Sequence, residues 1–199
     1  GVWGHGNREA IGEKANTLAL KAIAVDPEFG WAHMAMGLAC FVQLRHQDAL
    51  SAMLRGLELG PSDADAHAFH AMISSICGDR TTGLGAIAKA IRLSPQFING
   101  PYLNVQAQSH FLNGDYVNAI ASHEANIARG GPVGPPALCW AAASYHATGR
   151  TDDTRRTLDV LHTRFPQFRL QGWNFLELFP ERSERHRVRD LMKDAGIPD

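Results

Sequence analysis

The sequence has little net charge, few cysteines and no long apolar run. Its 199 residues carry a formal net charge of −1. A charge this small gives no electrostatic reason to expect nucleic acid or an anionic membrane surface as a partner. No apolar stretch approaches the roughly 20 residues that a helix needs to cross a bilayer. We therefore expect a protein that binds neither nucleic acid nor membrane.

The cysteines do not form a recognisable chemical motif. Cys40, Cys77 and Cys139 lie far apart in the sequence, among Ala, Met and Trp. A redox pair or a metal site would need close spacing between them. We interpret them as small buried residues in a reducing compartment, which favours a cytoplasmic location.

Motifs of enzyme active sites are also missing. The sequence has no G-x-x-x-x-G-K-[ST], H-E-x-x-H, G-x-S-x-G or C-x-x-C. The glycine-rich phrases at 4–6 and 83–85 lack the preceding strand that a phosphate loop needs. Asp63 and Asp65 lie where the first residues of a helix are expected, not where an acid–base pair would be. We expect no catalytic residues, no cofactor and no metal.

What the sequence does contain is a fixed spacing of prolines. Pro27, Pro61 and Pro95 lie 34 residues apart and end similar phrases, KAIAVDP, RGLELGP and KAIRLSP. Pro166 ends a fourth phrase, VLHTRFP, two periods and three residues farther on. Aromatic residues are only 8% of the chain, and no strand-like alternation of Val, Ile and Thr is present. The pattern predicts an array of one small helical unit.

Small residues recur at fixed places within each period. They are Ala15 and Ala22 before Pro27, Gly37, Ala49 and Gly56 after it, and Ala71, Gly83 and Ala90 after Pro61. Two helices can approach closely only where both carry small side chains. Gly78, Gly114 and Gly149 mark the turns between paired helices, because glycine readily adopts the left-handed backbone that ends a helix.

The coarse prediction is a series of short helices. We expect them at 8–25, 29–43, 46–59, 63–77, 80–93, 98–113, 116–129, 135–148 and 151–164. Plausible N-cap residues are Ser62 or Asp63, Asp115 and Thr151. The segment GGPVGPP at 130–136 predicts a longer loop within the array.

These features resemble the tetratricopeptide (TPR) repeat over roughly residues 8–166. The resemblance implies an all-α fold, a right-handed TPR superhelical solenoid of about four helix pairs with a C-terminal capping helix. It implies a repeat array over 1–166, whose first repeat is incomplete, and a capping segment over 167–199 in the same domain. His33 and His67 depart from the pattern, because a large aromatic residue is usual at their position. The incomplete first repeat suggests that the chain is a fragment or a processed piece of a longer protein.

The tail carries a second, narrower resemblance. Its phrases FPQFRL, LFP and AGIPD are similar to the end of the TPR region in bacterial multidomain regulators. The N-terminal part of those proteins is commonly a class III nucleotidyl cyclase or a winged-helix domain. We expect the large apolar residues Trp173, Phe175, Leu176 and Phe179 to cover the end of the array. Arg182, Arg185, Arg187 and Arg189 would face water.

The TPR resemblance implies a binding groove lined by the first helix of each repeat. The residues predicted to line it are Trp31, Met34, Leu38, Phe41, Val42, Asp65, Met72, Asn99, Tyr102, Gln106 and His110. Two interpretations of the apolar residues at 31–42 remain open: they pack on the incomplete first repeat, or they accept a helix or peptide. The groove lacks the basic cluster that would bind an acidic C-terminal tail.

The expected function is therefore a non-catalytic interaction and regulatory module of a bacterial signalling protein. Its partner would be a protein or peptide, with self-association as one form. The alternative is a small-molecule or metal sensor that uses His67, His70 and His110.

Overall fold

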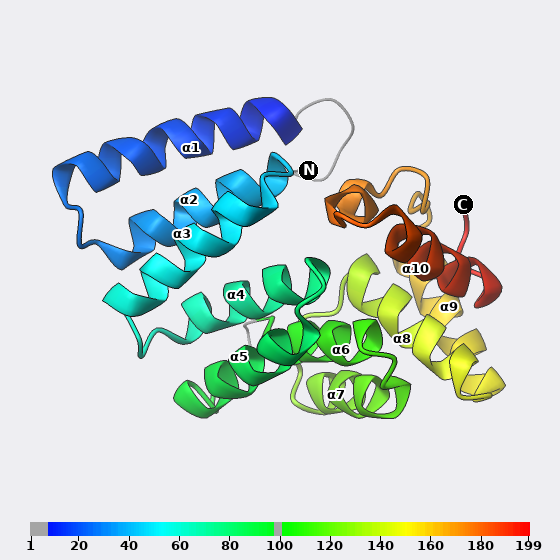
Figure 1. Ribbon diagram of the computed structural model, residues 1–199. Coiled ribbons are helices and arrows are strands. Elements are labelled where there is room, and N and C mark those ends of the chain that lie inside the picture. Colours follow the sequence, from blue (N-terminus) through cyan, green and yellow to red (C-terminus); the bar gives the residue numbers. More distant parts are fainter. Residues whose placement is uncertain (1–7, 98–100) are drawn as a thin grey trace. The chain divides into compact units, whose positions relative to one another are not determined.

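The computed structural model describes residues 8–97 and 101–199, and the regular structure of these residues is helical (Figure 1). The chain forms two compact units, Gly1–Ser94 and Pro95–Asp199. Paired helices make up both units, which confirms the predicted all-α repeat architecture of four pairs. The predicted extents of the array, 1–166, and of the capping segment, 167–199, stay a prediction.

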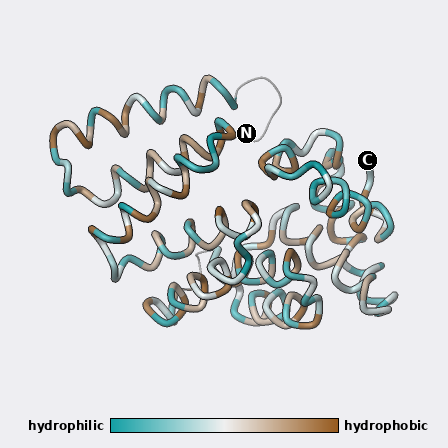
Figure 2. Tube along the Cα trace, in the orientation of Figure 1, coloured by the Kyte–Doolittle hydropathy of each residue, from teal (hydrophilic) through white to brown (hydrophobic). Residues whose placement is uncertain are grey.

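The described residues of the first unit, from Arg8 onward, form five helices that pack in chain order. They are α1 (Arg8–Val25), α2 (Gly30–Val42), α3 (His46–Leu59), α4 (Ala64–Ile76) and α5 (Arg80–Leu93). Each helix contacts the next one, and the most extensive contacts join α2 to α3 and α4 to α5. Apolar and polar residues alternate along these helices, as expected for helices with one face in a core (Figure 2).

Small residues lie where paired helices meet, as the sequence predicted. A Cβ atom on Gly37 of α2 would lie 3.0 Å from the carbonyl oxygen of Ala49 in α3. A Cβ atom on Gly56 of α3 would lie 3.0 Å from the carbonyl oxygen of Gly30. The backbones of α2 and α3 are therefore in near contact at two places, and a larger residue at either would push the helices apart.

The second unit is built around α8. Its elements are α6 (Tyr102–Leu112), α7 (Tyr116–Ala128), α8 (Pro135–Ala147), α9 (Thr151–Arg164), the 3-10 helix η1 (Asn174–Leu178) and α10 (Arg182–Asp194). Helix α8 contacts α6, α7, α9 and α10 and is buried along most of its length. Its Trp140 ring lies 5.0 Å from the ring of Phe111 and 5.6 Å from that of Trp173. This aromatic cluster joins the tail to the helix pairs of the unit.

The tail covers the unit as predicted, with one correction. Trp173, Phe175, Leu176 and Phe179 are buried. The expectation that all four arginines face water is wrong for Arg185, Arg187 and Arg189, which are half-buried, whereas Arg182 is exposed. Arg185 donates to the carbonyl oxygen of Phe179 at 3.0 Å, and Arg187 donates to that of Leu112 at 3.3 Å. The guanidinium groups of Arg185 and Arg187 thus reach carbonyl oxygens of the backbone.

The helix ends also follow the sequence, except at one cap. Asp63 accepts a hydrogen bond from the N–H group of Ala66 at 2.9 Å, and Asp115 accepts one from the N–H group of Asn118 at 3.2 Å. Thr151 is not a cap, because α9 begins at that residue and Arg150 precedes it. Gly78, Gly114 and Gly149 have positive φ angles of 96°, 77° and 73°. Leu44, at the matching turn of the first pair, has φ 64° although it is not glycine.

Candidate partner-binding site

One face of α1 lacks the cover that its repeat equivalents have. At the spacing of 34 residues, Ala15 matches Ala49 and Gly83, and Ala22 matches Gly56 and Ala90. The equivalents in α3 and α5 are buried. Ala15 and Ala22 are only half-buried. Helix α1 therefore exposes the positions that α3 and α5 use to pack on α2 and α4.

Two larger apolar side chains extend this uncovered face. Leu18 is 57% exposed and Val25 is 88% exposed. With Ala15 and Ala22 they stand at i, i+3, i+7 and i+10, which places all four on one side of the helix. We call these four residues the open seam.

The covered face of α1 lies about 100° around the helix from the open seam. Gly12 and Ala19 are buried there. A Cβ atom on Gly12 would lie 3.1 Å from the side chain of Val42, at the end of α2. Helix α1 is thus held on α2 by one face, and its open seam keeps exposed surface.

Two lysines border the open seam on one edge. Lys14 and Lys21 are exposed and lie seven residues apart, about two turns of the helix. Neither has an ion-pair partner among residues 8–97 and 101–199. The edge therefore attracts acidic side chains.

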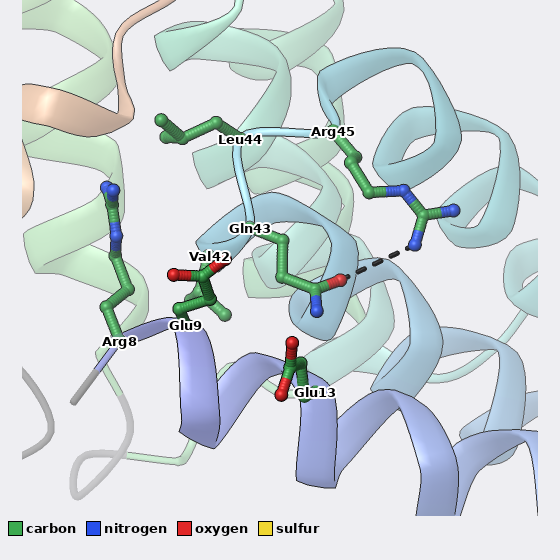
Figure 3. Close-up of a pocket in the computed structure, with 7 residues that line it drawn as sticks. All are labelled: Arg8, Glu9, Glu13, Val42, Gln43, Leu44 and Arg45. Carbon is green, nitrogen blue, oxygen red and sulfur yellow. Dashed lines mark hydrogen bonds between the residues drawn. The ribbon is translucent and has the colours of Figure 1, made fainter.

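A polar hollow lies beside the first turns of α1 (Figure 3). Its volume is about 410 Å³, and α1 contributes Arg8, Glu9 and Glu13 to its lining. The segment from Val42 to Arg45 forms the rest, with the side chains of Gln43 and Arg45 hydrogen-bonded at 3.4 Å. Two basic and two acidic side chains balance each other here, so the hollow has no preference for a ligand of one charge.

The predicted groove residues differ widely in exposure. In α2, Trp31 is 43% exposed and Leu38 and Val42 are half-buried, whereas Met34 and Phe41 are 2% and 1% exposed. Met34 and Phe41 are core side chains and offer almost no surface to a partner. Met34 lies beside Gly56 of α3, whose Cβ position is 2.7 Å from the Met34 side chain, and the choice between the two interpretations of this segment stays open.

The remaining predicted groove residues are mostly half-buried. Asp65, Met72, Gln106 and His110 fall in this class, and Tyr102 is 4% exposed. Asn99 lies outside the described residues. The side chain of Gln106 accepts a hydrogen bond from Ser122 at 3.3 Å, and His110 Nδ1 lies 3.2 Å from Asp115. The groove as a binding site stays a prediction.

Two of the histidines, His33 and His67, hydrogen-bond within the repeat turns. His33 Nε2 lies 2.8 Å from the carbonyl oxygen of Pro27, and His67 Nε2 lies 3.0 Å from that of Pro61. The same bond thus recurs one period apart, which explains why histidine replaces the usual aromatic residue. Burial, together with nearby His67, lowers the pKa of His70. Within the described parts of the chain, no three His, Cys, Asp or Glu side chains gather as metal ligands would.

The cysteines are poorly suited to nucleophilic chemistry. Burial raises the pKa of the Cys77 thiol to about 11, and it raises that of Cys139 further. The thiolate is the reactive form, so both groups are inert near neutral pH.

No described helix has both the length and the apolar composition that a bilayer crossing requires.

Comparison with known proteins supports the fold. No protein-family model matches the chain, and no curated protein matches it in sequence. Similar solved structures include MamA, at 16% identity and a TM-score of 0.59, covering 83% of this chain and 98% of MamA. A tetratricopeptide repeat protein from Parabacteroides merdae has 14% identity and a TM-score of 0.61, covering 95% of this chain and 75% of its own.

Cut9 in the Cut9–Hcn1 complex has 16% identity and a TM-score of 0.66, covering 94% of this chain and 40% of the matched chain. At such low sequence identity, the similarity concerns the backbone arrangement alone. Structures of TPR type share that arrangement. The chain therefore has the all-α TPR solenoid fold that its sequence predicted.

Proposed function

We propose that this chain is a non-catalytic protein-interaction module that binds an amphipathic helix of a partner protein on the open seam of α1. One observation carries the proposal: the seam residues keep exposed surface at the positions where α3 and α5 each hold a neighbouring helix. The bound helix would take the place beside α1 that α2 takes beside α3.

The open seam offers both apolar area and a close approach. Complete burial of a Leu or Val side chain contributes about 1.5–3 kcal/mol. Leu18 and Val25 keep most of their surface exposed, so covering both would contribute about 3 kcal/mol. Ala15 and Ala22 would let the partner's backbone come near, as Ala49 and Gly56 do in α3.

The charges beside the seam define the partner further. Two copies of α1 that pack in the antiparallel sense are related by a twofold axis perpendicular to the helices. That arrangement places Lys14 and Lys21 of one copy beside those of the other, and like charges repel. Antiparallel pairing between copies is therefore disfavoured at this face, and the partner helix should carry Asp or Glu along one edge.

Helix α4 supplies a defined probe for the experiment. It packs on α5 as the partner would pack on α1, and it carries Asp63 and Asp65 at its start. We expect a labelled, end-capped peptide of residues 63–76 to bind the intact chain in a fluorescence anisotropy titration. Higher salt should weaken the complex, because the lysine edge contributes.

A matched pair of variants separates the seam from the rest of α1. Leu18→Glu places a charge in the seam and should lower the affinity at least tenfold. Leu20→Glu is the control, because Leu20 is 51% exposed on the side of α1 away from the seam. Absence of peptide binding, or equal losses in both variants, would contradict the proposal.

We further infer that the module belongs to a cytoplasmic bacterial signalling protein and has a regulatory role. The similarity of the tail phrases FPQFRL, LFP and AGIPD to bacterial multidomain regulators supports this inference. The test is to isolate the natural polypeptide from its host and determine its full length. A cyclase or winged-helix domain in the same polypeptide would support the inference, and an unrelated domain would overturn it.

A further inference from the structure

A second hollow lies in the other unit, between α7 and α9 and above α8. Its volume is about 310 Å³. Helix α9 lines it with one face, at Asp153, Arg156, Val160 and Arg164, which stand at helical spacing. Helix α7 contributes His123 and Ile127 on the other side.

The middle of this hollow is apolar. Leu138 of α8 forms part of its floor and is 3% exposed. Ile127 of α7 and Val160 of α9 also line it and are 53% and 39% exposed, so both keep apolar surface that a ligand can cover. Val133, from the loop before α8, adds a fourth aliphatic side chain. Contact between water and such an apolar surface is unfavourable, whereas an alkyl chain would be stabilised on it.

The rim of the hollow has an excess of positive charge. Arg164 has no acidic partner in the described part of the chain, and its guanidinium carbon lies 5.5 Å from the centre of the Phe165 ring. Arg156 pairs with Asp153, which also binds Arg150 at 2.7 Å. One carboxylate thus serves two guanidinium groups, and Arg164 is left to attract an anion.

His123 and Tyr145, two other polar residues that line the hollow, leave that excess of positive charge in place. Tyr145 donates its O–H to Glu124 at 3.1 Å, and Arg150 pairs with the same carboxylate at 3.0 Å. Burial lowers the pKa of His123, so its ring is neutral near pH 7. His123 is 3% exposed, and its Nδ1 has no hydrogen-bond partner. An unpaired buried nitrogen is unusual in a folded protein.

We propose that this hollow binds a small amphiphilic anion, an unbranched alkyl chain that ends in a carboxylate. The chain lies between Ile127 and Val160 over Leu138, and the carboxylate lies at Arg164. The volume stands at the lower end of the range for ligand pockets, about 300–1,000 Å³, which suits a ligand of medium length. The site is in a different unit from the open seam and does not depend on the helix-binding function.

Decanoate is the probe for the first experiment. We expect its titration into the intact, isotope-labelled chain to shift the NMR signals of Val160, Ile127 and the His123 ring in a saturable manner. Octanoate should bind about 15-fold more weakly, because each buried methylene contributes roughly fourfold in affinity. Decyltrimethylammonium has the same chain and the opposite charge, and it should bind more weakly than decanoate.

Two variants with matched controls locate the site. Val160→Asp should abolish the shifts, and Arg164→Gln should weaken decanoate binding about two- to fivefold, as expected for an exposed ion pair. The controls are Val117→Asp, at a 69% exposed valine of α7 outside the hollow, and Arg155→Gln, on another face of α9. Circular dichroism of each variant verifies that it is folded.

Several results would overturn the proposal. Equal binding of the cationic amphiphile would reduce the site to an unspecific apolar surface. Loss of binding in the controls as well as in the site variants would place the ligand elsewhere. Absence of saturable shifts at millimolar decanoate would show that the hollow takes no such ligand. Tighter binding of a short peptide ending in leucine would reassign the site to a peptide.

Discussion

The pair Gly83 and Gly85 tests whether close helix approach determines this fold. Both glycines lie inside α5, two residues apart. Gly83 faces α4: a Cβ atom there would lie 2.1 Å from Ser75 Oγ and 3.0 Å from the carbonyl oxygen of Ala71. Gly85 faces away, with no atom within 4 Å of its Cβ position. Replacement of each by alanine therefore changes the helix in the same way and the packing in opposite ways.

The expected magnitudes follow from these contacts. Alanine inside a helix is more favourable than glycine by about 0.5–1 kcal/mol, because it loses less backbone entropy. Gly85→Ala should therefore raise the free energy of unfolding by that amount. Gly83→Ala receives the same contribution and also forces apart two packed elements, which costs about 1–3 kcal/mol. The oxygen of Ala71 belongs to the backbone, so the whole helix has to shift.

Urea unfolding followed by circular dichroism measures both variants against the parent chain. The free energy of unfolding of Gly83→Ala should lie about 1–3 kcal/mol below that of Gly85→Ala. The propensity contribution cancels in this difference. Adding Ser75→Ala to Gly83→Ala should recover part of the loss, because it removes the nearer contact. Equal stabilisation by both alanines would refute the claim that small residues are required where α4 meets α5.

Two further predictions concern a turn and the buried histidines. Gly149→Ala should lower the free energy of unfolding by about 1–2 kcal/mol. The φ angle is 73° and no atom would touch the new Cβ, so only the backbone penalty acts. Gly149→Asn should lose clearly less stability in the same urea titration, and equal losses would contradict this explanation. Burial lowers the pKa values of His70 and His123 in the folded state, so the unfolded chain binds more protons below about pH 6.5. As the pH falls from about 7.5 to 5.5, the free energy of unfolding should therefore decrease by at most about 1.4 kcal/mol per pH unit for each histidine. Urea midpoints measured across this range should vary less in His123→Gln, and an unchanged slope would contradict the assignment.

Local patterns explain how much of the fold could be predicted. The proline spacing and the small residues report contacts between helices that are adjacent in the chain, such as Gly37 with Ala49. Positive φ at Gly78 and Gly114 likewise depends on a few neighbouring residues. Asp79 is the N-cap of α5, and its side chain accepts a hydrogen bond from the N–H group of Thr82 at 3.1 Å. The sequence prediction did not include this cap, although an aspartate directly before an expected helix could have indicated it.

The candidate sites were harder to predict because exposure is not local. The repeat register assigns Phe41 and Trp31 to the same groove, yet Phe41 is 1% exposed and Trp31 is 43% exposed. The open seam had a sequence signal, the match of Ala15 to Ala49, but the signal does not say whether another helix covers it.

The sequence by itself determined the helical repeat, its period, the places of closest helix approach and the apolar tail. These depend on backbone preferences and on side chains within about one period of each other. Only the tertiary structure decided that Leu18 and Val25 stay exposed and that Ile127 and Val160, on different helices, line one hollow. The reason is physical: exposure and concavity depend on how separate helices are placed, and no single helix carries that information.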